Sequence, residues 1–174
     1  MSQMKYIKGD IVVYGTNGIC KIDDVQKMTF PMETEEHTYY VLKPIGSRTS
    51  TLFIPDHKEE LVSKMRYVLK KEEIDDILSG ANGKDIEWID DKNARNNCFR
   101  QILKDGKPED FLSLIRCIFE RKAFLAEKGK RLTAADDGIL TSAEKLVREE
   151  FAYTLGIGED EVAEYIRGKL EENK

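Results

Sequence analysis

The spacing of the apolar residues changes near Lys70, and this change constrains the fold more than any other feature of the sequence. Before that point, short apolar runs alternate with glycine, proline and acidic residues, a pattern typical of β-strands. After it, apolar residues recur at intervals of three and four positions, a pattern typical of amphipathic helices. We therefore predict an α+β protein of two domains, with a β-rich part followed by a helical part.

The β-rich part is predicted to contain five short antiparallel strands. Asn17-Gly18 separates the first two apolar runs, and this dipeptide favours a tight hairpin turn. The predicted strands cover residues 10–14, 19–28, 37–43, 49–54 and 66–69. Because short strands and turns alternate so closely, we expect residues 1–69 to form an SH3/Tudor-like antiparallel β barrel.

The helical part is predicted to begin with a short helix and a linker over residues 70–83. An all-α helical bundle is then expected over residues 84–174. Gly80, Gly106 and Gly156 follow predicted helix ends, whereas Pro108 occupies a first-turn position and Thr133 is a predicted N-cap. These signals divide the second half of the chain into successive helices with one apolar stripe each.

Several classes of protein are disfavoured by composition. No apolar stretch approaches the roughly 18 residues that a membrane helix needs, so we expect no membrane association. The first residues lack the apolar segment of a signal peptide. The three cysteines, Cys20, Cys98 and Cys117, are widely spaced, which suits a reducing compartment better than a disulfide framework. The sequence thus predicts a soluble cytoplasmic protein.

No catalytic site is predicted. His37 and His57 are the only histidines, and neither belongs to a zinc-binding or nucleophile motif. The sequence also lacks the glycine-rich motifs that bind nucleotide phosphates. Three adjacent acidic pairs, Asp75-Asp76, Asp90-Asp91 and Asp136-Asp137, could form metal or acid–base sites, but adjacent carboxylates on a helix point in different directions and favour caps or solvated faces. We expect no enzyme activity, no metal, no cofactor and no small-molecule ligand.

Charge is unevenly distributed although the whole chain carries a net charge of −5. Between Lys92 and Arg131 there are eleven basic and five acidic residues, and after Arg131 the two counts are reversed. A local positive field can attract phosphates despite a negative total. The alternative is a solvated helix pair with many ion pairs. Trp88, the only tryptophan, precedes the basic segment and could either cap a small core or act as a wedge against DNA bases.

An ordered series of motifs resembles the CarD/CdnL family of bacterial transcription regulators, whose N-terminal part is an RNA-polymerase-interacting domain. In the β-rich part the resemblance rests on Lys8-Gly9-Asp10-Ile-Val-Val-Tyr14, Asn17-Gly18, Tyr39-Tyr40-Val-Leu-Lys43 and Thr51-Leu-Phe-Ile-Pro55. In the helical part it rests on Trp88 before a helix, Asp105-Gly106, Leu132-Thr-Ala-Ala-Asp136 and Ala143-Glu-Lys-Leu-Val-Arg-Glu-Glu150. The resemblance covers nearly the whole chain.

The resemblance implies a function in transcription regulation. In such proteins the β domain binds the β subunit of bacterial RNA polymerase, sheet edge to sheet edge. The helical domain contacts promoter DNA weakly near the −10 element, where its tryptophan enters the minor-groove edge of the opening duplex and stabilises the open complex. Trp88 matches this wedge position, and the polymerase-binding surface maps onto Met28, Thr51, Leu52, Phe53 and Ile54.

This sequence departs from the family pattern at both surfaces. Met28 and Phe53 stand on the polymerase-binding face, where family members often have basic side chains. Ile89-Asp90-Asp91 follow Trp88, where basic residues are common. Phosphate contacts are therefore assigned to basic residues further along the chain: Lys92, Arg95, Arg100, Lys122, Lys130 and Arg131.

Three hypotheses of different classes follow. The leading one is the CarD-like regulator that contacts polymerase and promoter DNA. The alternative is a protein-binding adaptor that has a Tudor-like module and a purely structural helical domain. An enzyme that uses paired carboxylates is the third. DNA binding through Trp88 distinguishes the first hypothesis from the second.

Overall fold

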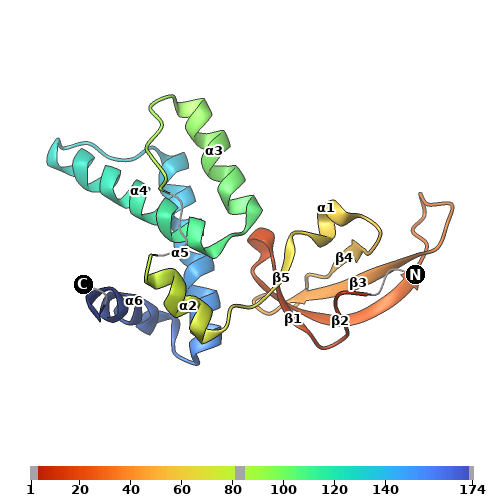
Figure 1. The fold of residues 1–174 in the computed structure, drawn as a ribbon. Helices are drawn as coiled ribbons and strands as arrows, with labels where there is room; N and C mark the ends of the chain where they lie inside the picture. Colours follow the sequence, from red (N-terminus) through yellow and green to blue (C-terminus); the bar gives the residue numbers. More distant parts are fainter. Residues whose placement is uncertain (1–3, 81–84, 173–174) are drawn as a thin grey trace. The chain divides into compact units, whose positions relative to one another are not determined.

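The structure is a computed structural model that describes residues 4–80 and 85–172. The chain divides into two compact units, Met1–Val68 and Leu69–Lys174, which we call the sheet unit and the helical unit. Figure 1 shows that every strand belongs to the first unit and that the long helices belong to the second. The α+β class predicted from the sequence is confirmed.

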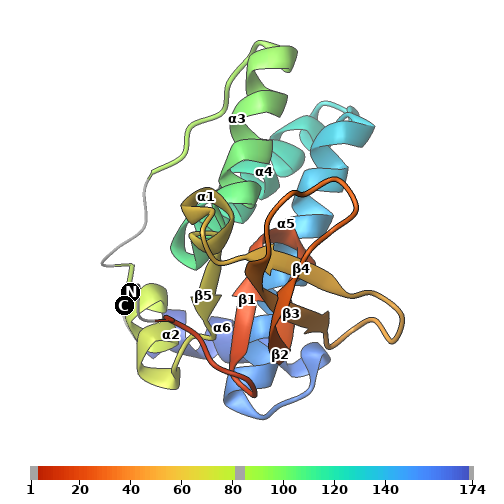
Figure 2. The same cartoon turned by 90° about the vertical axis from the view of Figure 1, so that its right-hand side faces the viewer.

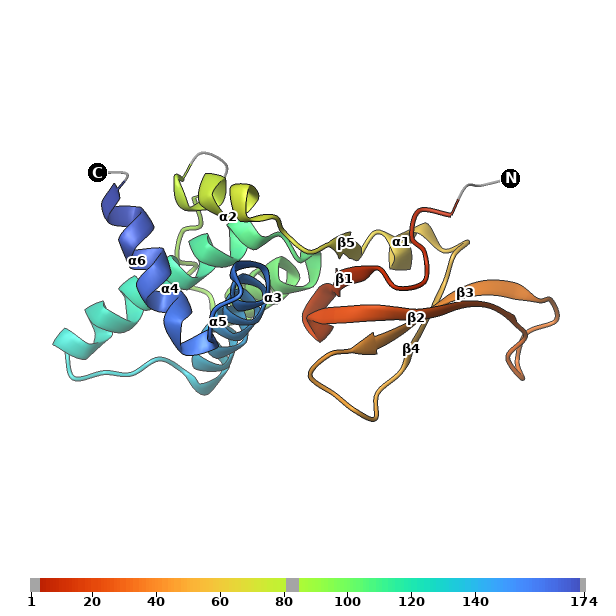
Figure 3. The ribbon, with the colours of Figure 1, turned by 90° about the horizontal axis from the view of Figure 1, so that it is seen from below.

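The sheet unit contains one antiparallel five-stranded sheet with the strand order β4-β3-β2-β1-β5. Its strands are β1 (Ile11–Tyr14), β2 (Ile19–Met28), β3 (His37–Pro44), β4 (Leu52–Pro55) and β5 (Met65–Tyr67). The short 3-10 helix η1 (Gly15–Asn17) joins β1 to β2, and Gly18 completes this turn with a φ of 73°. Positive φ is a conformation that glycine adopts readily, so the predicted hairpin forms at the predicted dipeptide. The longest pair, β2 and β3, runs side by side in Figure 3.

A β-bulge interrupts the long β2–β3 pair. Ile22 pairs with Leu42 and Asp24 pairs with Val41, so Asp23 is an extra residue in β2. Such a bulge bends the strand and increases its twist. The core of the sheet unit lies on one face of this bent sheet and is formed by Tyr6, Val12, Tyr14, Cys20, Ile22, Tyr40, Leu42, Ile54 and Met65.

The predicted SH3/Tudor-like barrel is not confirmed, because the sheet is open. Closure would need β4 and β5 to pair, yet they stand at opposite ends of the strand order. The chain between them forms the short helix α1 (Glu59–Val62), which was not predicted from the sequence. β5 is only three residues long and pairs with β1. A barrel needs a continuous ladder of tilted, staggered strands, which this connection does not provide.

The helical unit contains α2 (Lys71–Leu78), α3 (Lys92–Asp105), α4 (Pro108–Glu127), α5 (Ala134–Leu155), the 3-10 helix η2 (Glu159–Glu161) and α6 (Val162–Glu172). The predicted end signals are found in place. Asp91 caps α3 by accepting from the N–H of Ala94, and Gly106 ends that helix in the left-handed conformation. Thr133 caps α5 in the same way as Asp91 caps α3. Local capping chemistry therefore sets the helix boundaries.

α5 is the central helix of this unit. It packs against α2, α3, α4 and α6, and its apolar stripe Leu140, Ala143, Val147 and Phe151 is buried. Figure 2 shows α4 and α5 beside each other. α2 contributes Ile74 and Leu78 to the same core, so this segment, predicted as a helix followed by a linker, is packed into the helical unit. The end of the predicted linker, 81–83, lies outside the described residues.

Two side chains of α5 hold the first residue of the helical unit. The carboxylate of Glu150 accepts from the N–H of Leu69 at 2.9 Å, and Thr154 donates to the Leu69 carbonyl at 2.7 Å.

Within the described parts of the chain, no helix combines the length and hydropathy needed to cross a lipid bilayer.

Candidate functional sites

The first candidate site is formed around Trp88, in the segment that leads into α3. The indole is half-buried and contacts the ring of Phe99 on α3 edge to face, with a distance of 6.1 Å between ring centroids. It packs at the margin of the helical core, so its position is fixed while part of its surface stays accessible. A fixed and partly exposed indole can serve as a stacking or wedging surface.

Arg95 holds the segment that carries Trp88. Its guanidinium donates two hydrogen bonds of 2.9 Å to the carboxylate of Asp136 on α5. It also donates to the carbonyls of Ile89 and Asp90, at 2.9 and 3.2 Å, and lies 4.3 Å from the centroid of the Trp88 ring. A bidentate guanidinium–carboxylate pair has a fixed geometry. Arg95 therefore connects the Trp88 segment to α5.

The surroundings of Asp136 favour its ionised form. Burial of the carboxyl acts to raise its pKa, but hydrogen bonds from Arg95 and Thr133, together with the positive charges of Arg95 and Lys92, lower the pKa below its ordinary value. The side chain is almost completely buried and ionised. Asp136, interpreted from the sequence as a cap or solvated residue, is thus the partner of a buried guanidinium.

The residues predicted to contact DNA occupy different environments. Arg95 is only 5% exposed, and the protein itself uses its hydrogen-bond donors, so the structure gives it a positioning role rather than an accessible charge. The other predicted cations are exposed, and Lys122 forms an ion pair of 3.9 Å with Asp137. The exposed set is Lys92, Arg100, Lys122, Lys130 and Arg131.

Sequence reasoning did not assign Arg121 and Lys128, two cations that lie over aromatic rings of the helical unit. Arg121 of α4 lies 5.3 Å from the centroid of the Trp88 ring and 4.7 Å from that of Phe124. Lys128 lies 4.3 Å from the Phe124 centroid. Both basic residues belong to the positive segment, but only the packing of α4 beside the Trp88 segment distinguishes them from its other members. Spacings of three and four on one helix, as between Arg121, Phe124 and Lys128, are the available sequence signal.

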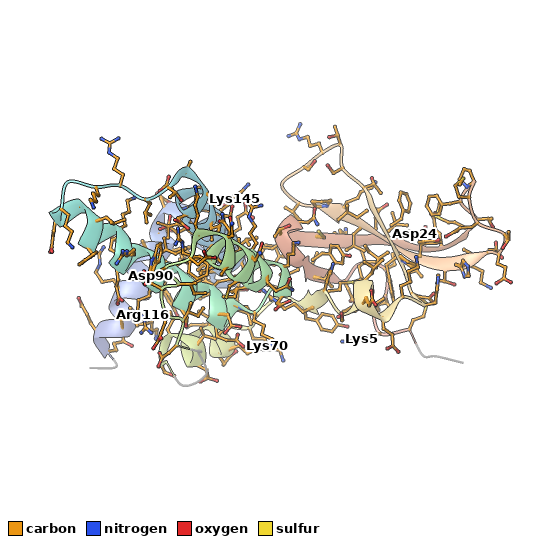
Figure 4. The ribbon with its side chains drawn as sticks, turned by 90° about the horizontal axis from the view of Figure 1, so that it is seen from above. Lys5, Asp24, Lys70, Asp90, Arg116 and Lys145 are labelled. Atoms are coloured by element: carbon orange, nitrogen blue, oxygen red, sulfur yellow. The ribbon has the colours of Figure 1, made fainter. Side chains whose placement is uncertain are left out.

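The segment that leads to Trp88 also takes part in an exposed ion pair. Arg116 of α4 lies 3.2 Å from the carboxylate of Asp85, and both side chains are exposed. Figure 4 labels Arg116 and Asp90, which come from α4 and from the segment before α3. Exposed ion pairs of this kind contribute little to stability but reduce the charge available to a ligand.

The second candidate site is the edge of the sheet at β4. The N–H of Asp56 donates to the carbonyl of Thr38 at 3.0 Å, which identifies a hydrogen-bonded pair in the β3–β4 register. Because such pairs alternate along an antiparallel ladder, the N–H and C=O of Leu52 and Ile54 point toward β3. Those of Phe53 point away from β3. Since β4 ends the strand order, Phe53 presents its backbone groups at the sheet edge.

Side chains at this edge are divided between the two faces of the sheet. Ile54 is buried in the core and Leu52 packs against it, whereas Phe53 is 39% exposed. The Phe53 ring contacts Phe30 edge to face at 5.6 Å. Of the five residues predicted to bind polymerase, Thr51 and Phe53 are exposed, Met28 and Leu52 are partly buried, and Ile54 is buried. Phe30 is the aromatic neighbour that sequence reasoning missed.

Comparison with known proteins identifies the first of the two units. Residues 6–66 match the family described as the CarD-like/TRCF RID domain. The match spans the sheet unit from before β1 into β5 and includes the β4 edge. No curated protein matches the chain.

Proposed function

We propose that this chain, whose sheet unit matches the CarD-like/TRCF RID domain over residues 6–66, is a CarD-like transcription regulator. In this proposal the sheet unit binds the β subunit of RNA polymerase. The helical unit contacts promoter DNA near the −10 element and stabilises the open complex. No catalytic step is part of the proposed function.

The open β4 edge is the observation that carries the polymerase half of the proposal. An edge strand with unpaired N–H and C=O groups can accept a strand from a partner. Phe53 supplies both backbone groups, and its ring lies beside Phe30, so a partner strand would gain main-chain hydrogen bonds and an apolar contact. Because this edge lies within the matched domain, it is our assignment for the polymerase contact.

The surroundings of Trp88 support the DNA half. The indole is partly accessible, is fixed by Phe99 and Arg95, and has the cation of Arg121 beside it. A regulator that binds opened DNA more tightly than closed DNA shifts the equilibrium toward opening. A tenfold shift needs a difference of only about 1.4 kcal/mol in binding free energy. One wedged ring and a few phosphate contacts can supply a difference of this size.

Capture of the chain by purified fragments of the β subunit tests the polymerase contact. Phe53→Glu places a carboxylate at the β4 edge and should abolish capture. Ile7→Glu is the matched control, because Ile7 is 65% exposed in the same unit and precedes β1 rather than β4. Undiminished capture of the Phe53→Glu chain would remove the β4 edge from the proposal.

Binding to fork-junction promoter DNA tests the helical unit. Trp88→Ala should weaken binding, whereas Tyr153→Ala should leave it unchanged. Tyr153 is the matched control because it is an aromatic residue of the same unit that is 48% exposed, near the C-terminal end of α5. Equal affinities for the wild-type and Trp88→Ala chains would instead favour the adaptor hypothesis, in which Trp88 only completes the helical core. The packing of Trp88 on Phe99 is the observation that favours this second hypothesis.

A further inference from the structure

Aromatic rings and cations alternate along one side of the helical unit, in the order Arg95, Trp88, Arg121, Phe124 and Lys128. The four distances between a cation and the centroid of its neighbouring ring are 4.3, 5.3, 4.7 and 4.3 Å. We call the part from Trp88 to Lys128 the ring–cation series. A cation within about 6 Å of a ring centroid is attracted to the ring. Each side chain in the series is therefore held by its neighbours.

The cations of this side differ in how their charge is compensated. Arg95 is buried and paired with Asp136. In contrast, no carboxylate in the described parts of the chain lies within 4.0 Å of Arg121 or Lys128, and the buried Nε of Arg121 has no hydrogen-bond partner there. Arg116 and Lys122, on the same helix, do have such partners. Arg121 and Lys128 thus have no carboxylate partner among the described residues, although ring contacts restrict their positions.

The ring between these two cations is accessible. Phe124 is 41% exposed, and its ring lies between the cations of Arg121 and Lys128. Arg121 and Phe124 are three positions apart on one face of α4, and Lys128, the C-cap residue of that helix, follows four positions after Phe124. At a rise of about 1.5 Å per residue, Arg121 and Lys128 stand roughly 10 Å apart along the helix. This face continues directly from Trp88.

We infer that the ring–cation series is one continuous nucleic-acid-binding surface, in which Arg121 and Lys128 each bind a backbone phosphate and Phe124 adds a second apolar contact. The inference rests on the proposed function of the helical unit and extends its DNA contact beyond Trp88. Nucleic acid suits the surface because it alternates apolar base faces with phosphates, and aromatic stacking with cationic contacts is the chemistry that binds single strands. An acidic protein segment would match the cations but would not use the exposed rings.

Salt dependence of DNA binding separates this surface from a general positive charge. The anisotropy of labelled fork-junction DNA is measured at several salt concentrations with the full chain. Arg121→Gln and Lys128→Gln should each weaken binding about tenfold at low salt, as expected for one charge-assisted contact. Each should also make the plot of log affinity against log salt shallower by about 0.9, or about 0.7 if the contacted strand is single. Phe124→Ala should weaken binding without a change of slope.

Arg116→Gln is the matched control, because it removes the same charge from the same helix where that charge is already paired with Asp85. Its slope should equal that of the wild type. Arg121 is partly buried, so thermal unfolding of each variant checks the fold. If Arg121→Gln is unfolded, the result with the exposed Lys128 decides the inference.

The possible failures can be distinguished. If Trp88→Ala weakens binding but both glutamine variants keep the wild-type slope, the ring–cation series is not a DNA surface, while the proposed function stands. If the wild-type chain has no measurable DNA affinity, the proposed function and this inference both fail. Loss of β-subunit capture by Arg121→Gln with unchanged DNA binding would assign the surface to a protein partner and overturn the inference.

Discussion

Asp136 is the residue on which the local order around Trp88 depends. Its carboxylate receives both guanidinium hydrogen bonds from Arg95, and Arg95 in turn holds two carbonyls of the Trp88 segment. A buried arginine that loses its carboxylate keeps an uncompensated charge in a medium of low polarizability. The pair is therefore sensitive to single substitutions, although its net contribution to stability can be small.

Asp136→Asn should lower the free energy of unfolding by about 3–5 kcal/mol, the usual effect of removing one member of a buried ion pair. Urea unfolding followed by circular dichroism measures this. Asp137→Asn is the matched control, because Asp137 is exposed and has only a 3.9 Å ion pair with Lys122; its effect should stay within about 1 kcal/mol. Equal effects of the two variants would show that the buried pair has no special role.

The same pair predicts a pH dependence. The pKa of Asp136 is lowered in the folded state, so the carboxylate stabilises the fold above its unfolded pKa and this stabilisation is lost as the pH falls through the folded value. The difference in unfolding free energy between wild type and Asp136→Asn should therefore narrow below about pH 4. A constant difference between pH 7 and pH 3 would contradict the assignment.

The three cysteines should react at different rates. Burial raises the pKa of Cys20 to about 11 and also raises that of Cys117, whereas Cys98 on α3 is exposed. Because the thiolate is the reacting form, one thiol per folded chain should react rapidly with a disulfide reagent at pH 8. Cys98→Ser should remove this rapid phase, and all thiols should react after denaturation. A rapid phase that survives Cys98→Ser would place the accessible thiol elsewhere.

At the scale of the element, β4 has two kinds of backbone N–H. The N–H of Ile54 faces β3, whereas that of Phe53 faces the sheet edge. Proline is tolerated in a strand only where no ladder hydrogen bond is lost. Phe53→Pro should therefore leave the thermal unfolding of the sheet nearly unchanged while abolishing capture by the polymerase β subunit. Ile54→Pro is the comparison variant and should lower the unfolding temperature markedly. The reverse order of stabilities would show that the register argument is wrong.

Elements defined by local chemistry were predicted well from the sequence. The Asn17-Gly18 turn, the cap at Thr133 and the stop at Gly106 depend on neighbouring residues only, and their elements begin and end within a few positions of the prediction. The open sheet could not be predicted in this way, because closure depends on whether β4 and β5 meet. Local patterns contain no information on that pairing.

The environment of the basic residues could not be predicted from the sequence either. Arg95 stands in a helix with many polar residues, and its partner Asp136 is 41 positions further along the chain. Nothing in the local pattern separates it from exposed cations such as Arg100. In the same way, the special position of Arg121 depends on the approach of Trp88 to α4. Which charges are buried, paired or stacked is decided by packing between distant segments.

At the scale of the whole molecule, the proposed function requires two contacts that act together. Tethering to the polymerase raises the effective concentration of the helical unit at the promoter, so a weak DNA contact becomes sufficient. Phe53→Glu should therefore keep the affinity for isolated fork-junction DNA, and Trp88→Ala should keep capture by the β subunit. Each variant alone should shorten the lifetime of the open complex.

Lifetimes of open complexes on a linear promoter fragment measure this, and the double variant provides the control. The double variant should be no worse than Phe53→Glu alone, because without tethering the DNA contact contributes little. Strictly additive losses would show that the two units act independently, which contradicts a bridging role.

The extra residue Asp23 bends the β2–β3 pair but does not change which side chains face the core. Ile22 and Val25 both face the core although three positions separate them, because the bulge absorbs one residue. Deletion of Asp23 would restore a regular two-residue alternation without turning either side chain over. A chain shortened in this way would keep the side chains of the proposed polymerase-binding edge but would hold them on a less bent sheet. The shape of that edge would then change while its chemical groups stay the same.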